Sequence, residues 1–255
     1  MGWSWAGGGA GVSNTDGTIT STVSASTTSG FSIVTFTGNG TAGASVGHGL
    51  GVVPKMLFWK STNSGTTSDH WTLYHAEMDA TSPEDYAMHL NLTNARNQSS
   101  TYWNLTAPTS TVFTLGYNAP YLNVSGRTYV AYCFAEVEGY SKFGSYTGNA
   151  DADGPFVYCG FKPAFVLMKR SSTTGAWKIF DNKRPNAHNV IDARIEADSN
   201  GAESTNSVYS IDLVSNGFKL RGTSGEQNGS GDTFVFAAFA SSPFGGSGVS
   251  PATAR

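Results

Sequence analysis

The sequence contains few charged residues. Only 13% of its 255 residues are Asp, Glu, Lys or Arg, about half of the share in an average globular protein. The formal net charge is −3, so the chain offers neither a basic face for nucleic acid nor a polybasic stretch for anionic lipid. We expect no nucleic-acid partner and no membrane partner.

Long hydrophobic runs are also absent. No apolar run approaches the roughly 18 residues that a membrane span needs. The first residues lack the basic and apolar regions of a signal peptide, and Ala6 stands where a myristoylation pattern requires Ser or Thr. We therefore expect a protein that is made and folded in a cytoplasm.

Cysteine is nearly absent, since Cys133 and Cys159 are the only two in the chain. Both lie in apolar, strand-like stretches, YVAYCFA and PFVYCGF. This setting favours two buried, reduced thiols that pack as small hydrophobic side chains. A disulfide between them is the alternative, because sequence spacing alone does not decide the pairing.

The abundant residues are those of strands and turns. The chain has 31 glycines and 13% aromatic residues, and Ser, Thr and Asn crowd the stretches between apolar runs. Aromatic and β-branched residues suit pleated strands, whereas Gly, Asn and Ser suit turns. The composition predicts an all-β protein.

The sequence also repeats itself, which indicates two similar structural units. SGRTYVAYCFA at residues 125–135 aligns without a gap with SGDTFVFAAFA at residues 230–240. Further matched blocks in the same order are FSIVTFTGN (31–39) with YSKFGSYTGN (140–149), GVVPKMLFWK (51–60) with GFKPAFVLMK (160–169), and WTLY (71–74) with WKIF (177–180).

The blocks read as short strands separated by turn residues, which is typical of β-sandwich and jelly-roll domains. We predict two tandem β-sandwich or jelly-roll-like repeats, preceded by an N-terminal strand or arm. The predicted parts are an arm at residues 1–29, repeats at residues 30–138 and 139–244, and a flexible Gly/Ser tail at residues 245–255.

The first residues, MGWSWA, resemble the closing strand of a repeat. Trp3 and Trp5 align with Tyr132 and Phe134, and Ala6 aligns with Ala135. Our hypothesis is an orphan strand formed by Trp3, Trp5 and Ala6, which adds to a sheet of a neighbouring subunit or another protein.

Catalytic motifs are missing. The sequence has no nucleophile elbow, no cysteine near a suggestive histidine and no recognisable pair of catalytic acids, so we expect neither enzymatic activity nor a cofactor. Residues 69–89 gather His70, His75 and His89 among acidic residues, but a solvated polar loop is favoured over a metal site because the spacing suits no single face.

One short stretch resembles half of a calcium loop. Asn149, Asp151 and Asp153, followed by Gly154, match the first positions of an EF-hand, but Gly160 stands where that loop needs a bidentate Glu. We favour an ordinary turn, with calcium as the alternative.

Four aromatic residues are placed in polar stretches: Tyr102, Trp103, Tyr117 and Tyr121. Aromatic rings beside Asn and Ser suit stacking on sugars, so these residues are candidates to face a ligand. We favour packing in a core or between units over this role.

Several long phrases resemble a domain family of tailed bacteriophages, notably marine and cyanobacterial ones. They are GVSNTDGTITSTVSAS, GFSIVTFTGNGTAGASVGHGLGVVPKM, TYVAYCFAEVEGYSKFGSYTGN and DGPFVYCGFKPAFVLMKR, and the resemblance spans residues 11–244. Proteins of that family are usually described as tail fibres or uncharacterised virion structural proteins.

The resemblance implies a non-enzymatic virion protein that is assembled in the host cytoplasm and displayed on the particle surface. It implies other virion proteins of the capsid or tail as partners and a homo-oligomer, with a trimer favoured. A tail-fibre or tail-associated adhesin that binds a host surface glycan is the first expectation. A capsid decoration or tail-architecture protein is the alternative, and a polysaccharide depolymerase is a remote one.

Overall fold

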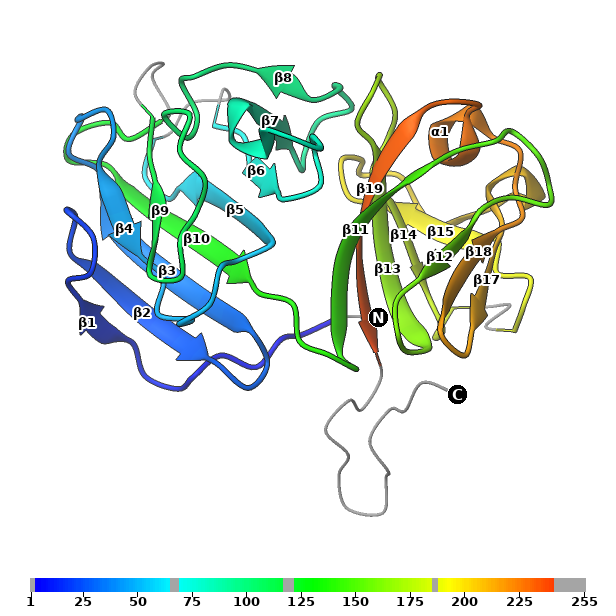
Figure 1. The fold of residues 1–255 in the computed structure, drawn as a ribbon, viewed down its shortest axis with the longest axis horizontal. Coiled ribbons are helices and arrows are strands. Elements are labelled where there is room, and N and C mark those ends of the chain that lie inside the picture. Colours follow the sequence, from blue (N-terminus) through cyan, green and yellow to red (C-terminus); the bar gives the residue numbers. More distant parts are fainter. Residues whose placement is uncertain (1–2, 65–68, 117–121, 185–187, 241–255) are drawn as a thin grey trace, which may run out of the picture. The chain divides into compact units, whose positions relative to one another are not determined.

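The computed structural model describes residues 3–64, 69–116, 122–184 and 188–240. Over these residues the protein is built of antiparallel β-sheets, which confirms the prediction of an all-β sandwich fold. It divides into two compact units (Figure 1). The first comprises the described residues up to Leu90 together with Arg96–Glu136, and the second comprises Asn91–Ala95 and the described residues from Val137 onward.

The first unit consists of a large sheet and a small sheet that share one core. In spatial order, the large sheet contains β1 (Val12–Asn14), β2 (Ser21–Ser26), β3 (Phe31–Thr37), β10 (Thr128–Phe134), β5 (Met56–Ser61), β6 (Thr72–His75), β7 (Tyr86–His89) and β8 (Asn97–Gln98). The small sheet pairs β4 (Ser45–Gly47) with β9 (Val112–Thr114), and the short 3-10 helix η1 (Pro83–Asp85) precedes β7.

The second unit repeats this plan without the first two strands. Its large sheet contains, in spatial order, β11 (Ser141–Thr147), β19 (Thr233–Ala240), β13 (Pro163–Arg170), β14 (Lys178–Asp181), β15 (Ala193–Glu196) and β16 (Ser204–Thr205). Its small sheet contains β12 (Phe156–Tyr158), β18 (Gly217–Leu220) and β17 (Ile211–Val214). A 3-10 helix, η2 (Ser207–Tyr209), precedes β17, and the single-turn helix α1 (Gly225–Asn228) precedes β19.

The two cores contain the same arrangement of three aromatic rings. These rings are Phe36, Tyr129 and Phe113 in the first unit and Tyr146, Phe234 and Phe218 in the second. The first two rings of each set stack at centroid distances of 5.2 and 4.9 Å, and the third meets the first edge-on at 6.1 Å in both units. The third ring comes from the small sheet, so these contacts join the two layers of each sandwich.

A buried asparagine explains the shared TGN block. Asn123 and Asn228 are fully buried, 105 positions apart in the aligned repeats. Each side-chain oxygen accepts a hydrogen bond from the backbone N–H of the TGN asparagine, and each side-chain amide donates to a carbonyl two residues further on. The partners are Asn39 (3.0 Å) and Thr41 (2.8 Å) in the first unit, and Asn149 (2.9 Å) and Asp151 (2.8 Å) in the second.

The N-terminal arm is part of the first unit. Its strand β2 pairs with β3 along the whole of Ser21–Ser26, and β1 pairs with β2. The predicted arm at residues 1–29 thus contributes β1 and β2 to the large sheet, while its Ile19 forms a bridge with Val46 of the small sheet. The chain passes from the first unit to the second between Glu136 and Val137, near the predicted boundary at 138/139, and the predicted tail at residues 245–255 lies outside the described residues.

Both cysteines are free and buried. Cys133 lies in the core of the first unit and Cys159 in the core of the second. Burial raises the pKa of the Cys133 thiol to about 12, because the apolar surroundings disfavour the thiolate. The structure therefore shows two packed thiols, and the alternative of a disulfide between them does not hold.

Candidate functional site

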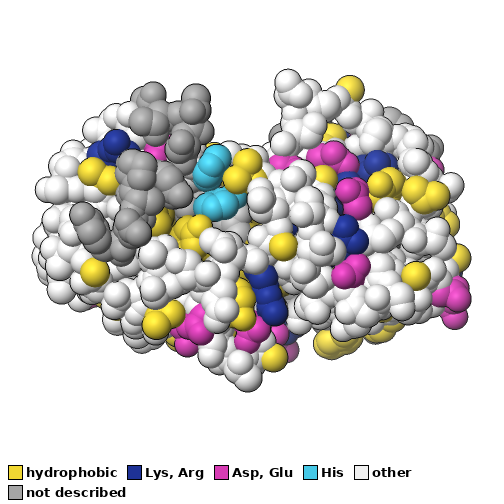
Figure 2. All heavy atoms as spheres, turned by 90° about the horizontal axis from the view of Figure 1, so that it is seen from above, with side chains coloured by type: hydrophobic (Ala, Val, Ile, Leu, Met, Phe, Trp, Pro, Cys, Tyr) yellow, Lys and Arg dark blue, Asp and Glu magenta, His cyan; other side chains and the backbone are white. Residues whose placement is uncertain are grey.

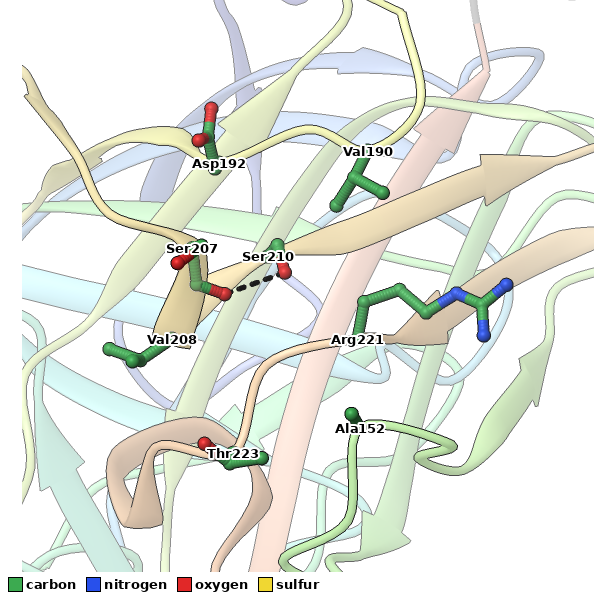
Figure 3. Close-up of a pocket in the computed structure, with 8 residues that line it drawn as sticks. All are labelled: Ala152, Val190, Asp192, Ser207, Val208, Ser210, Arg221 and Thr223. Carbon is green, nitrogen blue, oxygen red and sulfur yellow. Dashed lines mark hydrogen bonds between the residues drawn. The ribbon is translucent and has the colours of Figure 1, made fainter.

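The second unit carries a pocket of about 550 Å³. Figure 3 shows its eight lining residues, which come from separate loops and strand ends around the small sheet: Ala152, Val190, Asp192, Ser207, Val208, Ser210, Arg221 and Thr223. The lining combines one carboxylate, one guanidinium, three hydroxyl groups and two valines. It is the strongest candidate for a ligand site among the described residues, because polar groups of three kinds line it beside apolar surface.

Neighbouring carboxylates hold Arg221 in place. Arg221 directly follows β18, and its Nε donates to Oδ2 of Asp212 on β17 at 2.6 Å. Its Nη1 lies 3.8 Å from Oδ1 of Asp153. The backbone N–H of Arg221 donates to the carbonyl of Ser210 at 2.9 Å. The guanidinium is thus oriented before any ligand arrives, and 39% of the side chain remains exposed to receive one.

Hydrogen bonds also fix the residues on the hydroxyl side of the pocket. The Ser210 hydroxyl donates to the Ser207 carbonyl at 2.7 Å, the bond drawn in Figure 3. The side chain of Asn206 caps η2 by accepting from the backbone N–H of Val208. The side chains of Val190 and Val208 are 48% and 41% exposed. Two accessible apolar groups therefore lie among fixed polar ones.

The lining residues offer several groups for hydrogen bonds with a ligand. The lining residues include one carboxylate only and no histidine, cysteine or lysine, so they supply neither a pair of acids for glycoside hydrolysis nor a nucleophile with its base. A carboxylate, a guanidinium and hydroxyls can share hydrogen bonds with several neighbouring hydroxyl groups of a ligand, while valines contact its C–H groups.

The aromatic residues proposed to face a ligand lie elsewhere. Trp103 is 1% exposed, its Nε1 donates to the Tyr86 carbonyl at 2.8 Å, and its ring packs against Trp59 and Tyr74. Tyr102 is also buried. Both side chains lie in the core of the first unit, as the favoured interpretation expected, and the ligand-facing role suggested for these two is wrong. Tyr117 and Tyr121 lie outside the described residues.

Residues 149–153, which resemble half of a calcium loop, form a turn that is stabilised by hydrogen bonds between its own side chains and its own backbone. Oδ1 of Asn149 accepts from the backbone N–H of Asp151, and Oδ1 of Asp151 accepts from that of Asp153. Oδ1 of Asp153 pairs with Nζ of Lys219 at 2.8 Å, which holds the pKa of Asp153 below its ordinary value. Over the described residues, no group of three or more His, Cys, Asp and Glu side chains is arranged to hold a metal ion.

The histidine-rich stretch places two rings together. His70 and His89 lie 5.1 Å apart between ring centroids, whereas His75 is buried in β6 and accepts from the backbone N–H of Glu77. Burial, with a smaller effect of His70, lowers the pKa of His89 to about 4. Figure 2 shows histidine side chains side by side at the surface, and elsewhere on this face hydrophobic and charged side chains in small scattered groups.

The N-terminal tryptophan segment contacts its own first unit. Residues 3–8 form no strand in the structure. The ring of Trp5 meets that of Phe134 edge-on at 5.8 Å, and the Ala6 carbonyl accepts from the Ser29 hydroxyl at 3.2 Å. Trp3 is partly buried. Pairing of these residues with a neighbouring subunit stays a prediction.

The pocket was not predicted from the sequence. Its residues come from four separate stretches between positions 152 and 223, and only the stretch around Ala152 overlaps a motif, the half calcium loop at residues 149–154. The sequence feature that could have indicated the pocket is the set of segments in the second repeat that have no match in the first. Such insertions in a repeated domain form loops, and loops often carry function.

The structure is a duplicated antiparallel β-sandwich with a pocket on its second unit. Residues 1–243 match the model of a family described as a domain of unknown function, DUF7483. The match covers nearly the whole chain, so the protein belongs to this family. No curated protein and no solved structure matches the chain. Within the described part of the chain, no helix has the length and apolarity that crossing a membrane requires.

Proposed function

We propose that the protein is a non-enzymatic structural protein of a tailed-bacteriophage particle, a tail-fibre or tail-associated adhesion component whose second unit binds a glycan of the host surface. The virion role is supported by the resemblance of residues 11–244 to phage structural proteins. The observation that carries the adhesion role is the pocket around Asp192 and Arg221, which combines hydroxyl, carboxylate and guanidinium groups with two exposed valines.

Hydroxyl-rich sugars match this lining. A carboxylate accepts from two adjacent sugar hydroxyls, and a guanidinium held by Asp212 donates to a third. The valines give a small apolar surface for the C–H face of a pyranose ring. Arg221 is already neutralised by its carboxylate neighbours, so the expected ligand is a neutral polyhydroxylated glycan.

A glycan array probed with the purified full chain tests adhesion. Binding to neutral glycans is expected, and Asp192→Asn should weaken it about tenfold or more, because a hydrogen bond to a charged group contributes about 1.5–3 kcal/mol. Glu138→Gln, at an exposed position of the same unit, is the matched control and should bind normally. Absence of binding to any glycan at high protein concentration would contradict the adhesion role.

Electron microscopy of particles labelled with an antibody against the chain tests the location. Label on the tail is expected. Label on the capsid lattice would replace the adhesion role by capsid decoration, and no label on any particle would contradict the virion role.

The N-terminal segment has its own test within this proposal. Deletion of residues 1–8 should abolish homo-oligomerisation, for which a trimer is the expected state, while both units stay folded. Gel filtration with light scattering measures the mass, and circular dichroism measures the fold. Normal assembly of the shortened chain would contradict the assembly role of Trp3, Trp5 and Ala6.

A further inference from the structure

Strands β4 and β12 occupy the same position in the two units. Val46 of β4 lies opposite Phe113, and Val157 of β12 lies opposite Phe218. Phe113 and Phe218 are the equivalent rings of the two cores, 105 positions apart. The residues on either side of each valine are therefore equivalent too. Phe156 and Tyr158 stand where the first unit has Ser45 and Gly47.

In the first unit the N-terminal arm covers the outer edge of β4. Alternate residues of an edge strand direct their N–H and C=O groups away from the sheet. The Ile19 N–H donates to the Ser45 carbonyl at 3.0 Å, and the Ser21 hydroxyl donates to the Gly47 carbonyl at 3.0 Å. The Ser45 N–H donates to the Thr18 hydroxyl at 2.9 Å. Residues 18–21 thus close this edge.

In the second unit the equivalent edge is open. The Cys159 N–H donates to the Asn216 carbonyl, and the Pro155 carbonyl accepts from the Leu220 N–H. This alternation turns the backbone groups of Phe156 and Tyr158 away from β18. Among the described residues, β12 pairs with β18 alone, and no hydrogen bond reaches the outward groups of Phe156 and Tyr158.

The side chains beside this edge are apolar and accessible. Phe156 is 47% exposed and Tyr158 is 61% exposed, whereas Val157 between them is buried. Natural edge strands are usually protected by very short length, charges, prolines or bulges. The strand Phe156–Tyr158 is three residues long, but it contains no charge, no proline and no bulge in its pairing. Exposed aromatic side chains are enriched at the centres of protein interfaces.

We infer that the open edge of β12 binds an extended segment of another polypeptide chain, which adds to the small sheet of the second unit as residues 18–21 add to that of the first. The N-terminal arm of the first unit indicates which kind of segment can bind the edge of β12. It runs parallel to β4, with an Ile19–Val46 bridge, and its sequence TITSTV consists of hydroxyl and β-branched residues only. The partner segment has this chemistry, with backbone hydrogen bonds giving affinity and its β-branched side chains packing against Phe156 and Tyr158.

The probe is a synthetic peptide with the sequence of residues 14–26, NTDGTITSTVSAS, added to the full chain. Hydrogen–deuterium exchange, read by mass spectrometry over fragments spanning residues 44–48 and 155–159, locates its binding. We expect exchange of the Phe156 and Tyr158 amides to slow about tenfold at saturation, because new backbone hydrogen bonds protect them. The fragment at 44–48 should not change, since the chain's own arm already covers it.

Two controls make the test specific. A peptide with proline in place of Ile19 lacks the N–H that donates in the first unit and should not protect residues 155–159. Tyr158→Lys in the protein should weaken binding, whereas Val52→Lys, at an exposed position of the first unit, should leave it intact.

Three results would overturn the inference. They are no protection of residues 155–159, equal protection by the proline peptide, and protection of residues 44–48 alone, which would show exchange with the chain's own arm. Pairing of β12 with β12 of a second copy, seen as concentration-dependent dimerisation lost in Tyr158→Lys, would also overturn it, because the occupant would then be the same edge.

Discussion

Single buried polar side chains shape the turns of both units. Asn228 is fully buried, accepts from the N–H of Asn149, and donates to the carbonyls of Asp151 and Gly222. An aspartate would lose the donor, and an aliphatic side chain would lose both functions. The asparagine is therefore specific for this turn, as its counterpart Asn123 is in the first unit.

Asn228→Ala is expected to lower the free energy of unfolding of the second unit by about 2–3 kcal/mol, because it removes three hydrogen bonds to the backbone and leaves the buried Gly222 carbonyl without this partner. Urea unfolding followed by near-ultraviolet circular dichroism measures the change. Asn200→Ala, at an exposed position, should change stability by less than about 0.5 kcal/mol. A loss of stability in Asn228→Ala no larger than that in the control would contradict the role of Asn228 in stabilising this turn.

His89 makes the stability of the first unit depend on pH. Burial, and then His70, lower its pKa from 6.5 to about 4. Between these two values the unfolded chain binds the proton and the folded chain does not, so the free energy of unfolding falls as the pH falls from 6.5 to 4. The full loss would be about 3 kcal/mol at 1.36 kcal/mol per pH unit.

His89→Gln should flatten this dependence over the same pH range, and denaturant unfolding at several pH values measures it. His48 retains part of the slope, because burial lowers its pKa as well. His188→Gln, at an exposed position, is the control and should keep the slope of the natural sequence. An unchanged slope in His89→Gln would contradict the assignment.

At the scale of elements, the arm is the main difference between the units. Ile19 is 7% exposed and belongs to the core of the first unit, although it lies outside any strand. The segment around it links β2 to the small sheet, so the arm contributes to both layers. The second unit folds around the same rings without such a segment.

Ile19→Ala should therefore destabilise the first unit by about 2–4 kcal/mol, through the lost burial and the cavity left behind. Hydrogen exchange should accelerate in β2 and β4 but not in β18. Val12→Ala, at a position that is 65% exposed, is the matched control and should have little effect. Equal acceleration in β18 would show that the arm is not specific to the first unit.

The strands were predictable from the sequence because their signal is local. The matched blocks at residues 125–135 and 230–240 form the inner strands β10 and β19. The nearly continuous apolar segment KPAFVLMK forms a strand that is buried on both faces. The partners of Tyr102 and Trp103 were not predictable, since polar neighbours in sequence do not reveal which residues fold over a ring. The pocket was not predictable either, because its loops are far apart in the sequence and come together only in the fold.

At the scale of the whole molecule, each unit has its own core, and neither hydrophobic cluster includes a residue of the other. We expect two transitions in a calorimetric unfolding scan. Phe113→Ala should shift one of them and Phe218→Ala the other, each by about 3–5 kcal/mol of destabilisation, because both rings are fully buried. A shift of both transitions by either substitution would contradict independent cores.

The arm makes the two units different in their exposed edges. The first unit has a closed β4 edge, and the second has an open β12 edge in the described residues. A contact between copies that used the open edge and a different surface of the next copy would be heterologous, and such contacts close into a ring when the rotation allows it. The duplication that made the two halves alike in fold thus left them unequal in what they can bind.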